Sequence, residues 1–373
     1  MKAALVVRSS TGFKFRISSI AIPPIGPLEI LVQLSATGVC GTDMALASGE
    51  VGPTCQILGH EGIGRVVQVG QGVPASDVQV NDRVGIAWLR DICGKCAYCL
   101  HPGGETRCAE QLNSGRKIDG TFAEYAVVPA RYLVRIPDHV KTSDEMLAPI
   151  LCGGVTAYKA LRVCGASGGQ WVAVLGAAGG VGAFAIQYAR AMGLRVLAID
   201  AGEAKGKYCL DLGAEKYIDV VDTTDLAAQA AKITGGRGIS AALAIAGSAK
   251  GYQAALEILG PFGTLVCVGI PPPHELVSFH PLLFIDKGIK IVGSAVGTRE
   301  DILDAIEFVE RGLVKSNIVR ATLLDLPKIA KEFGKTLSIS DNWSISKLHC
   351  ITPLKLSSWP FPYPALSIRC DAA

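Results

Sequence analysis

Four closely spaced cysteines constrain this chain more than any other feature of its sequence. Cys93, Cys96, Cys99 and Cys108 lie in one short stretch between two β-like segments. Thiolates two residues apart can converge on one tetrahedral ion, because the loop between them turns back on itself. Unrelated free cysteines prefer burial, whereas this stretch is otherwise polar. The pattern therefore predicts a zinc site, and because four protein ligands leave no open coordination position, we expect a structural role.

Length and composition predict a globular protein with two domains. The chain has 373 residues, 49% of them hydrophobic and 18% charged, which is enough apolar material for two cores. Its 36 basic and 33 acidic residues nearly balance, so we expect neither nucleic acid nor a membrane as partner. The first residues lack a signal-peptide core, and no segment approaches the roughly 18 apolar residues of a membrane span. The 12 cysteines then indicate the reducing cytoplasm.

The two halves of the chain follow different patterns. Up to about residue 150, short β-rich segments are separated by turn residues, which predicts a compact all-β unit. From about residue 154, apolar strands alternate with helical segments, which is typical of a parallel sheet covered by helices on both faces. The expected fold class is therefore α/β, with a separate β-rich domain. We expect strands at 1–8, 30–34, 64–69, 83–87, 123–128 and 132–136, and then at 171–175, 195–199, 217–220, 241–246, 264–268 and 289–292.

The last segment breaks this pattern. From about Leu337 onward, Ser, Trp and Pro accumulate, as in the run from Trp359 to Pro364, without a helical or alternating period. We therefore expect an irregular or disordered tail.

A glycine-rich turn follows the strand expected at 171–175. A strand, a glycine turn and a helix in this order bring backbone amides close to a pyrophosphate at the helix N-terminus, although the spacing is one residue longer than G-x-G-x-x-G. Asp200 ends the next strand, where a carboxylate can bind both ribose hydroxyls and repel a 2′-phosphate, so NAD is favoured over NADP. Asp200 as a plain surface carboxylate and Lys205 as a solvated helix residue are the alternatives. The turn contains Gly176, Gly179, Gly180, Val181 and Gly182.

Three further metal-ligand residues stand beside glycines at widely separated positions. They are Cys40, His60 and Cys152. Two thiolates and one imidazole are the ligand set of an open catalytic zinc, which leaves a fourth position for water or an alcohol. Each residue alone is more simply explained as part of a core, so their joint occurrence carries the hypothesis.

Together these motifs resemble the zinc-containing medium-chain alcohol dehydrogenases, and most closely the yeast-type enzymes. The resemblance covers about residues 1–335. It implies a GroES-like catalytic domain at 1–153, a Rossmann NAD-binding domain at 154–295, a return segment towards the catalytic domain at 296–336 and an atypical tail at 337–373. It also implies a homodimer or homotetramer assembled partly through edge strands of the Rossmann domain. Five motifs occur in the family's order: Cys40-Gly41-Thr42-Asp43, Gly59-His60-Glu61-Gly62, the cysteine stretch, Cys152 to Leu161, and Gly176 to Gly182.

The resemblance also implies roles for individual residues, two zinc ions per chain and NAD. Cys40, His60 and Cys152 match the ligands of the catalytic zinc, and Cys93, Cys96, Cys99 and Cys108 match those of the structural zinc. Glu61 matches a carboxylate that assists ligand exchange, Asp43 the partner that orients His60, and Thr42 the hydroxyl that binds the alcohol oxygen. The expected cofactor-binding residues are Gly176, Gly179, Gly180, Val181, Gly182, Asp200, Lys205, Val268 and Arg299.

The sequence departs from the family in three places that bear on function. Gly41 and Ala45 replace histidines that are frequent in yeast-type enzymes, so an imidazole proton relay is absent. Cys99 and Cys108 are one residue farther apart than usual. After about Lys335, the chain does not resemble the closing helix and strands of the family, and missing strands would expose a sheet edge.

These observations favour an NAD-dependent zinc alcohol dehydrogenase, or a carbonyl reductase in the reverse direction. Its partner would be a small-molecule alcohol or carbonyl compound. Two alternatives stay open. One is an enzyme dedicated to a secondary-metabolite pathway, which the missing histidines motivate. The other is a cofactor-binding scaffold without activity, which the atypical tail motivates. Trp88 is expected either at the substrate cleft or in the core.

Overall fold

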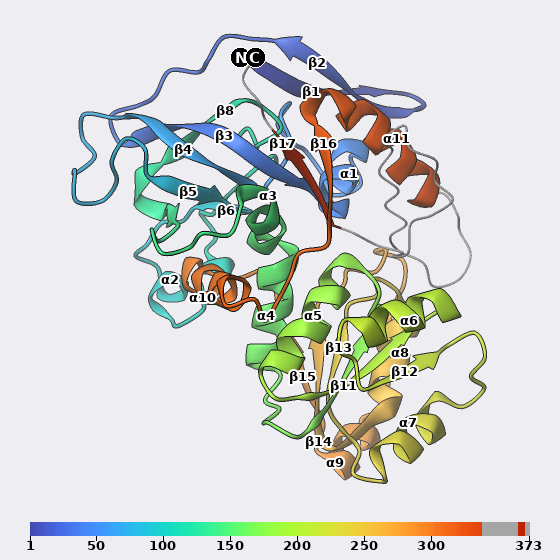
Figure 1. The fold of residues 1–373 in the computed structure, drawn as a ribbon. Coiled ribbons are helices and arrows are strands. Elements are labelled where there is room, and N and C mark those ends of the chain that lie inside the picture. The colour runs from blue at the N-terminus through green and yellow to red at the C-terminus, as the bar shows by residue number, and fades with distance from the viewer. Residues whose placement is uncertain (338–364, 370–373) are drawn as a thin grey trace.

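A seven-stranded sheet organises the first half of the molecule. The computed structural model describes residues 1–337 and 365–369. The sheet has the order β16-β17-β3-β4-β5-β9, and β8 also pairs with β3. Two smaller antiparallel pairs, β1-β2 and β6-β7, flank it (Figure 1). The strands are β1 (Lys2–Ser9), β2 (Gly12–Ser19), β3 (Glu29–Val39), β4 (Gly62–Val69), β5 (Arg83–Ile86), β6 (Leu89–Asp91), β7 (Leu112–Asn113), β8 (Tyr125–Pro129), β9 (Val134–Arg135), β16 (Ile318–Thr322) and β17 (Ala365–Arg369).

The tail contributes a strand to this sheet, which corrects the expectation of an irregular segment after Leu337. β17 runs parallel to β16 and antiparallel to residues 36–39 of β3. The sheet edge predicted to be exposed is therefore covered there. The last four residues of β17, Leu-Ser-Ile-Arg, alternate apolar and polar side chains, a strand pattern that the preceding Trp- and Pro-rich run obscured. That run lies outside the described residues.

A parallel six-stranded sheet forms the second half. Its order, β12-β11-β10-β13-β14-β15, is that of a doubly wound dinucleotide-binding fold. Val172 and Val174 of β10 face one buried cluster, and Trp171, Ala173 and Leu175 face another. Because both faces are covered, the strand is apolar throughout. The strands are β10 (Trp171–Leu175), β11 (Arg195–Asp200), β12 (Lys216–Asp219), β13 (Ile239–Ala244), β14 (Leu259–Cys267) and β15 (Lys290–Gly293).

Helices cover both faces of the parallel sheet and close one side of the first half (Figure 1). Several helices in the second half begin or end at a glycine or a proline. This is expected, because the backbone leaves the helical φ/ψ range at a helix end, and these residues suit such positions. Among the described residues, no helix combines the length and the hydropathy that crossing a bilayer requires. The α-helices are α1 (Gly41–Ser48), α2 (Ala97–Leu100), α3 (Asp144–Leu147), α4 (Gly153–Val163), α5 (Gly180–Ala191), α6 (Glu203–Asp211), α7 (Leu226–Thr234), α8 (Ala249–Ile258), α9 (Leu282–Lys287), α10 (Arg299–Glu310) and α11 (Leu326–Leu337); the 3-10 helices are η1 (Glu105–Arg107), η2 (Ala130–Tyr132), η3 (Ala148–Leu151) and η4 (Leu323–Asp325).

Candidate active site and metal centres

The structure brings together the two cysteines and the histidine expected to bind a catalytic metal. The Sγ atoms of Cys40 and Cys152 lie 3.9 Å apart, and Nε2 of His60 lies 3.3 Å from Sγ of Cys152. With a carboxylate oxygen of Glu61, these atoms all lie within 4.8 Å of one another. Ligands of a tetrahedral zinc ion lie about 3.5–3.8 Å apart, given Zn–S and Zn–N distances of roughly 2.3 and 2.0 Å. The spacing and the soft donor set therefore fit zinc.

Helix starts and a strand start position these three ligands. Cys40 immediately precedes α1, Cys152 immediately precedes α4, and His60 lies two residues before β4. Residues 30–37 of β3 pair with β4, so the sheet brings the first two ligands together. Cys152 lies between η3 and α4, where the first half of the chain joins the second.

Asp43 links the segments that carry two of these ligands, and it is fully buried. Its Oδ1 lies 2.9 Å from Nδ1 of His60 and accepts a 3.1 Å hydrogen bond from the amide of Gly59. Its Oδ2 accepts a 3.1 Å hydrogen bond from the amide of Cys40, which closes a capping box at the start of α1. One carboxylate thus fixes both the imidazole orientation and the backbone that carries a thiol.

Glu61 lies in a narrow space beside the metal-ligand cluster. Burial, and then the neighbouring Cys40, raise the pKa of this carboxyl well above its ordinary value. The space exists because residue 38 is a glycine. A Cβ atom there would lie 1.8 Å from Oε2 of Glu61, which is far inside van der Waals contact. Sequence reasoning missed Gly38, because its effect depends on Glu61, which is distant in the sequence and lies immediately before β4.

Thr42 and Trp88 border the same cluster. Thr42 is exposed in the first turn of α1. The Trp88 ring is partly buried and meets the His60 imidazole edge-on, with ring centroids 5.4 Å apart. Trp88 also packs against two hydrophobic clusters of the core, so it lies beside the metal-ligand cluster and contributes to core packing as well. At Gly41, an added Cβ would meet no atom within 4 Å, so there is open space beside this residue.

The four closely spaced cysteines form a second cluster, which we call the cysteine lobe (residues 93–108). Their four Sγ atoms lie within 4.8 Å of one another. Sγ of Cys99 lies 3.8 Å from that of Cys93 and 3.5 Å from that of Cys96, again near the tetrahedral spacing. Backbone amides of Lys95 and Cys96 lower the pKa of the Cys93 thiol to about 7, which favours the thiolate that metal binding needs. The longer loop before Cys108 does not prevent convergence.

The glycine-rich turn joins β10 to α5 as expected. Gly179 precedes the helix, and Gly180, Val181 and Gly182 form its first turn. A Cβ on Gly182 would lie 2.3 Å from the carbonyl oxygen of Gly176, so only glycine allows helix and turn to pack this closely. A Cβ on Gly180 would meet no atom within 4 Å. The backbone at the start of α5 therefore borders open space at Gly180.

Asp200 and Lys205 lie together at the end of β11. Nζ of Lys205 is 2.7 Å from Oδ1 of Asp200, and both side chains are largely buried. Oδ2 of Asp200 accepts a 3.0 Å hydrogen bond from the amide of Ala178 in the glycine turn. The carboxylate is thus held beside the turn, and neither residue is a plain solvated charge.

Val268 and Arg299 differ in their surroundings. Val268 follows β14 and is partly buried against the core of the parallel sheet. Arg299 turns towards the other half of the molecule. Its guanidinium lies 4.3 Å from the centroid of the Tyr132 ring and 3.7 Å from a carboxylate oxygen of Glu105. Arg299 therefore links α10 to the first half of the molecule. None of these contacts concerns the cofactor, and the cofactor-binding role of Arg299 stays a prediction.

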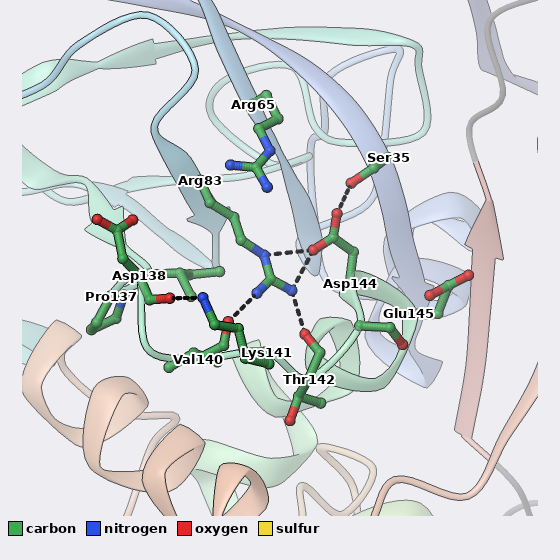
Figure 2. Close-up of a pocket in the computed structure, with 12 residues that line it drawn as sticks. Ser35, Arg65, Arg83, Pro137, Asp138, Val140, Lys141, Thr142, Asp144 and Glu145 are labelled. Atoms are coloured by element: carbon green, nitrogen blue, oxygen red, sulfur yellow. Dashed lines mark hydrogen bonds and ion pairs between the residues drawn. The ribbon is translucent and has the colours of Figure 1, made fainter.

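A polar cavity of about 610 Å³ lies between the seven-stranded sheet and α3. Figure 2 shows the Arg83 guanidinium pointing at Asp144. Arg83 also donates to the carbonyls of Val140 and Thr142, and Asp144 accepts from the Ser35 hydroxyl. The charged groups at the centre therefore bind one another. They fix α3, which continues through η3 directly to Cys152.

Comparison with known proteins identifies relatives over most of the chain. Residues 26–138 match the alcohol dehydrogenase GroES-like domain, and residues 180–311 match the zinc-binding dehydrogenase family. An alcohol dehydrogenase of Geobacillus stearothermophilus is 39% identical over 338 residues, covering 90% of this chain and 96% of the relative. Alcohol dehydrogenase 1 of Emericella nidulans is 40% identical over 83% of this chain and 88% of its own.

Solved structures agree with the sequence comparison. The alcohol dehydrogenase of the hyperthermophilic archaeon Aeropyrum pernix superposes with a TM-score of 0.80 and 25% identity, covering 99% of this chain and 100% of that one. The fold, the two convergent donor clusters and the relatives agree, and the chain belongs to the zinc-containing medium-chain alcohol dehydrogenase family.

Proposed function

We propose that this chain is an NAD-dependent zinc alcohol dehydrogenase, which transfers a hydride between a small alcohol and NAD⁺ or, in reverse, between NADH and an aldehyde or ketone. The observation that carries the proposal is the convergence of Cys40, His60 and Cys152 on a point with the spacing of zinc ligands. Two sulfurs and one nitrogen leave one position for substrate.

In this proposal, Cys40, His60 and Cys152 hold the catalytic zinc. Zinc bound there is a Lewis acid that favours the deprotonated alcohol and polarises the carbonyl in the reverse direction. Asp43 keeps Nδ1 of His60 engaged, so that Nε2 faces the other ligands. Glu61, buried beside the cluster, supplies a carboxylate that can exchange with these ligands.

Thr42 accepts the proton of the alcohol hydroxyl and passes it onward. Its side chain is exposed on the first turn of α1, beside the Cys40 ligand. Because residue 41 is glycine, no imidazole continues the relay, and the proton leaves through the cofactor ribose or through water. Trp88, edge-on to His60, forms one wall of an apolar substrate cleft.

The carboxyl ends of the parallel strands would hold the cofactor NAD. The amides of Gly179 to Gly182 at the start of α5 would bind its pyrophosphate. Asp200, held by Lys205 and by the amide of Ala178, binds the adenosine ribose, and its charge disfavours a 2′-phosphate. Val268, at the end of β14, packs near the nicotinamide. The cysteine lobe holds a second, structural zinc.

We also propose the domain division at 1–153, 154–295 and 296–336, a cytoplasmic location and an assembly into a homodimer or homotetramer. An exposed apolar surface at the β15 edge supports the assembly. Leu276 and Ile285 are 82% and 76% exposed, and Ile291 lies on β15 itself. An unpaired edge strand with apolar neighbours is a natural site for a second copy.

Replacement of Cys152 by serine tests the proposal. Cys164 is a matched control, because it is a buried cysteine at the other end of the same helix and its sulfur accepts from the amide of Ala166. We expect Cys152→Ser to lose about one zinc per chain and at least about 100-fold in alcohol-dependent NADH formation, while Cys164→Ser keeps both. A panel from ethanol to bulky aldehydes and ketones then defines the substrate class. Equal zinc contents and rates in the two variants would reject the proposed site.

A further inference from the structure

A buried lysine joins the cysteine lobe to the helix that begins after Cys152. Lys159 lies on α4, and 9% of its surface is exposed. Its Nζ lies 3.3 Å from the carbonyl oxygen of Gly103 and 3.4 Å from Oγ1 of Thr106, both in the lobe. The nearest carboxylate oxygen, on Asp301, is 3.9 Å away. Removing an ammonium group from water costs free energy. These contacts offset part of that cost for Lys159.

Besides Gly103, the three residues that precede Cys108 contact the second half of the molecule. Thr106 meets Lys159, as described. Glu105 lies 3.7 Å from Arg299 on α10, and Arg107 donates a 3.4 Å hydrogen bond to the carbonyl of Gly293 at the end of β15. Short 3-10 helix η1 therefore touches three elements of the second half with three successive side chains.

Among these contacts, the one made by Lys159 involves the helix that begins directly after a residue of the catalytic cluster. Cys152 is the residue immediately before α4, and Lys159 lies on the same continuous helix. Arg162, also on α4, binds Asp301 at 3.0 Å, and Asp301 caps α10 through Thr298. The lobe, α4 and α10 thus form one connected polar cluster. Thr106 of the lobe is therefore linked, through Lys159, to the helix that begins after Cys152.

We propose that Lys159 is a positioning residue through which the metal-filled cysteine lobe holds α4 and thereby the Cys152 thiolate. This inference rests on the proposed function, because it takes both clusters as zinc sites. The inference adds that the two sites are coupled. Loss of zinc from the lobe weakens the binding of the catalytic zinc, and this effect depends on Lys159. An alternative is that Lys159 only stabilises the fold, in which case the two metals leave independently.

A double-mutant cycle on zinc release distinguishes these cases. Release of zinc from purified holoprotein to a chromogenic chelator is followed at 25 °C. Cys99→Ser empties the lobe, Lys159→Met removes the ammonium, and the catalytic zinc is read by its release rate. We expect Cys99→Ser to accelerate that release at least tenfold in the wild-type background, and less than twofold in Lys159→Met. Equal accelerations in the two backgrounds, or none in either, would overturn the proposal.

Two further variants keep the test decisive. Thr106→Val keeps all four cysteines and removes one partner of Lys159, so a three- to tenfold acceleration is expected even if Cys99→Ser does not fold; an unchanged rate would count against the proposal. Lys207→Met is the matched control, since Lys207 is an exposed helical lysine paired with Asp211, and its release rate should equal that of the wild type. A wild-type sample with fewer than two zinc ions would instead reject the proposed function.

Discussion

Gly38 provides a sharp test of the catalytic geometry, because its missing side chain makes room for Glu61. An alanine Cβ there would lie 1.8 Å from Oε2, 2.8 Å from Cδ and 3.0 Å from Cβ of Glu61. The backbone at residue 38 is outside the positive-φ region, so the substitution acts through this overlap alone. Since Glu61 is buried, its carboxylate must move within packed surroundings.

The expected loss follows from the size of the overlap. Inserting a methyl group into a packed site costs about 1–3 kcal/mol, and replacing a strand glycine recovers about 0.5–1 kcal/mol. We therefore expect Gly38→Ala to lose about 1–2 kcal/mol, or several degrees in apparent Tm. A displaced Glu61 should also change the release rate of the catalytic zinc.

Two controls isolate the cause. Gly41→Ala places a methyl group three residues later, where no atom lies within 4 Å, and should leave Tm and zinc release unchanged. In a Glu61→Ala background, the cost of Gly38→Ala should fall below about 0.5 kcal/mol, because the overlapping carboxylate is gone. If Gly38→Ala costs as much without the Glu61 side chain as with it, the packing argument is refuted.

Three further outcomes are expected. Deleting residues 338–373 should lower the apparent Tm and the zinc content, because residues 36–39 of β3, next to Cys40, lose their pairing with β17; an unchanged Tm by differential scanning fluorimetry would contradict the role of the tail. Asp200→Asn should raise the Kd for NADH about tenfold, or roughly 1.4 kcal/mol, by fluorescence titration, and equal affinity would contradict the ribose contact. Hydrogen bonds from Lys141 and Thr142 lower the pKa of Glu310 to about 2. Its stabilisation is therefore complete above the unfolded pKa of about 4.3 and is lost as the pH falls towards 2. Glu310→Gln should lower Tm at pH 7, and its difference from the wild type should shrink below about pH 4.3. A gap that stays constant from pH 7 to pH 3 would contradict this assignment.

The fold and the convergence of the four closely spaced cysteines were predictable from sequence because their signals are local. The glycine turn, the apolar strands of the second half and the cysteine stretch each consist of neighbouring residues with distinctive chemistry. β10 has the predicted bounds, and the other five strands of its sheet overlap their predicted ranges. Cys40, His60 and Cys152 lie far apart in the chain, and the family resemblance was needed to group them.

The remaining features depend on contacts between distant residues. Gly38 could not be identified from its own sequence neighbourhood, because it makes room for the side chain of Glu61, which lies just before β4. In the sequence, Lys159 resembles any other helix residue. Only the structure shows that the lobe packs against α4 and buries this lysine. The contacts of Arg299 with Tyr132 and Glu105 likewise join distant parts of the chain, and its role in cofactor binding stays a prediction. The strand at 365–369 was overlooked because a short alternating run follows a long segment without period.

X-ray absorption at the zinc edge tests the central claim most directly. A holoprotein with one four-sulfur site and one site of two sulfurs, one nitrogen and one exchangeable oxygen should show, averaged over both metals, about three sulfurs and one nitrogen or oxygen per zinc, with Zn–S distances of about 2.3 Å. Four sulfurs per zinc and a stoichiometry of one metal would mean that Cys40, His60 and Cys152 do not bind zinc, and the proposed chemistry would have no site.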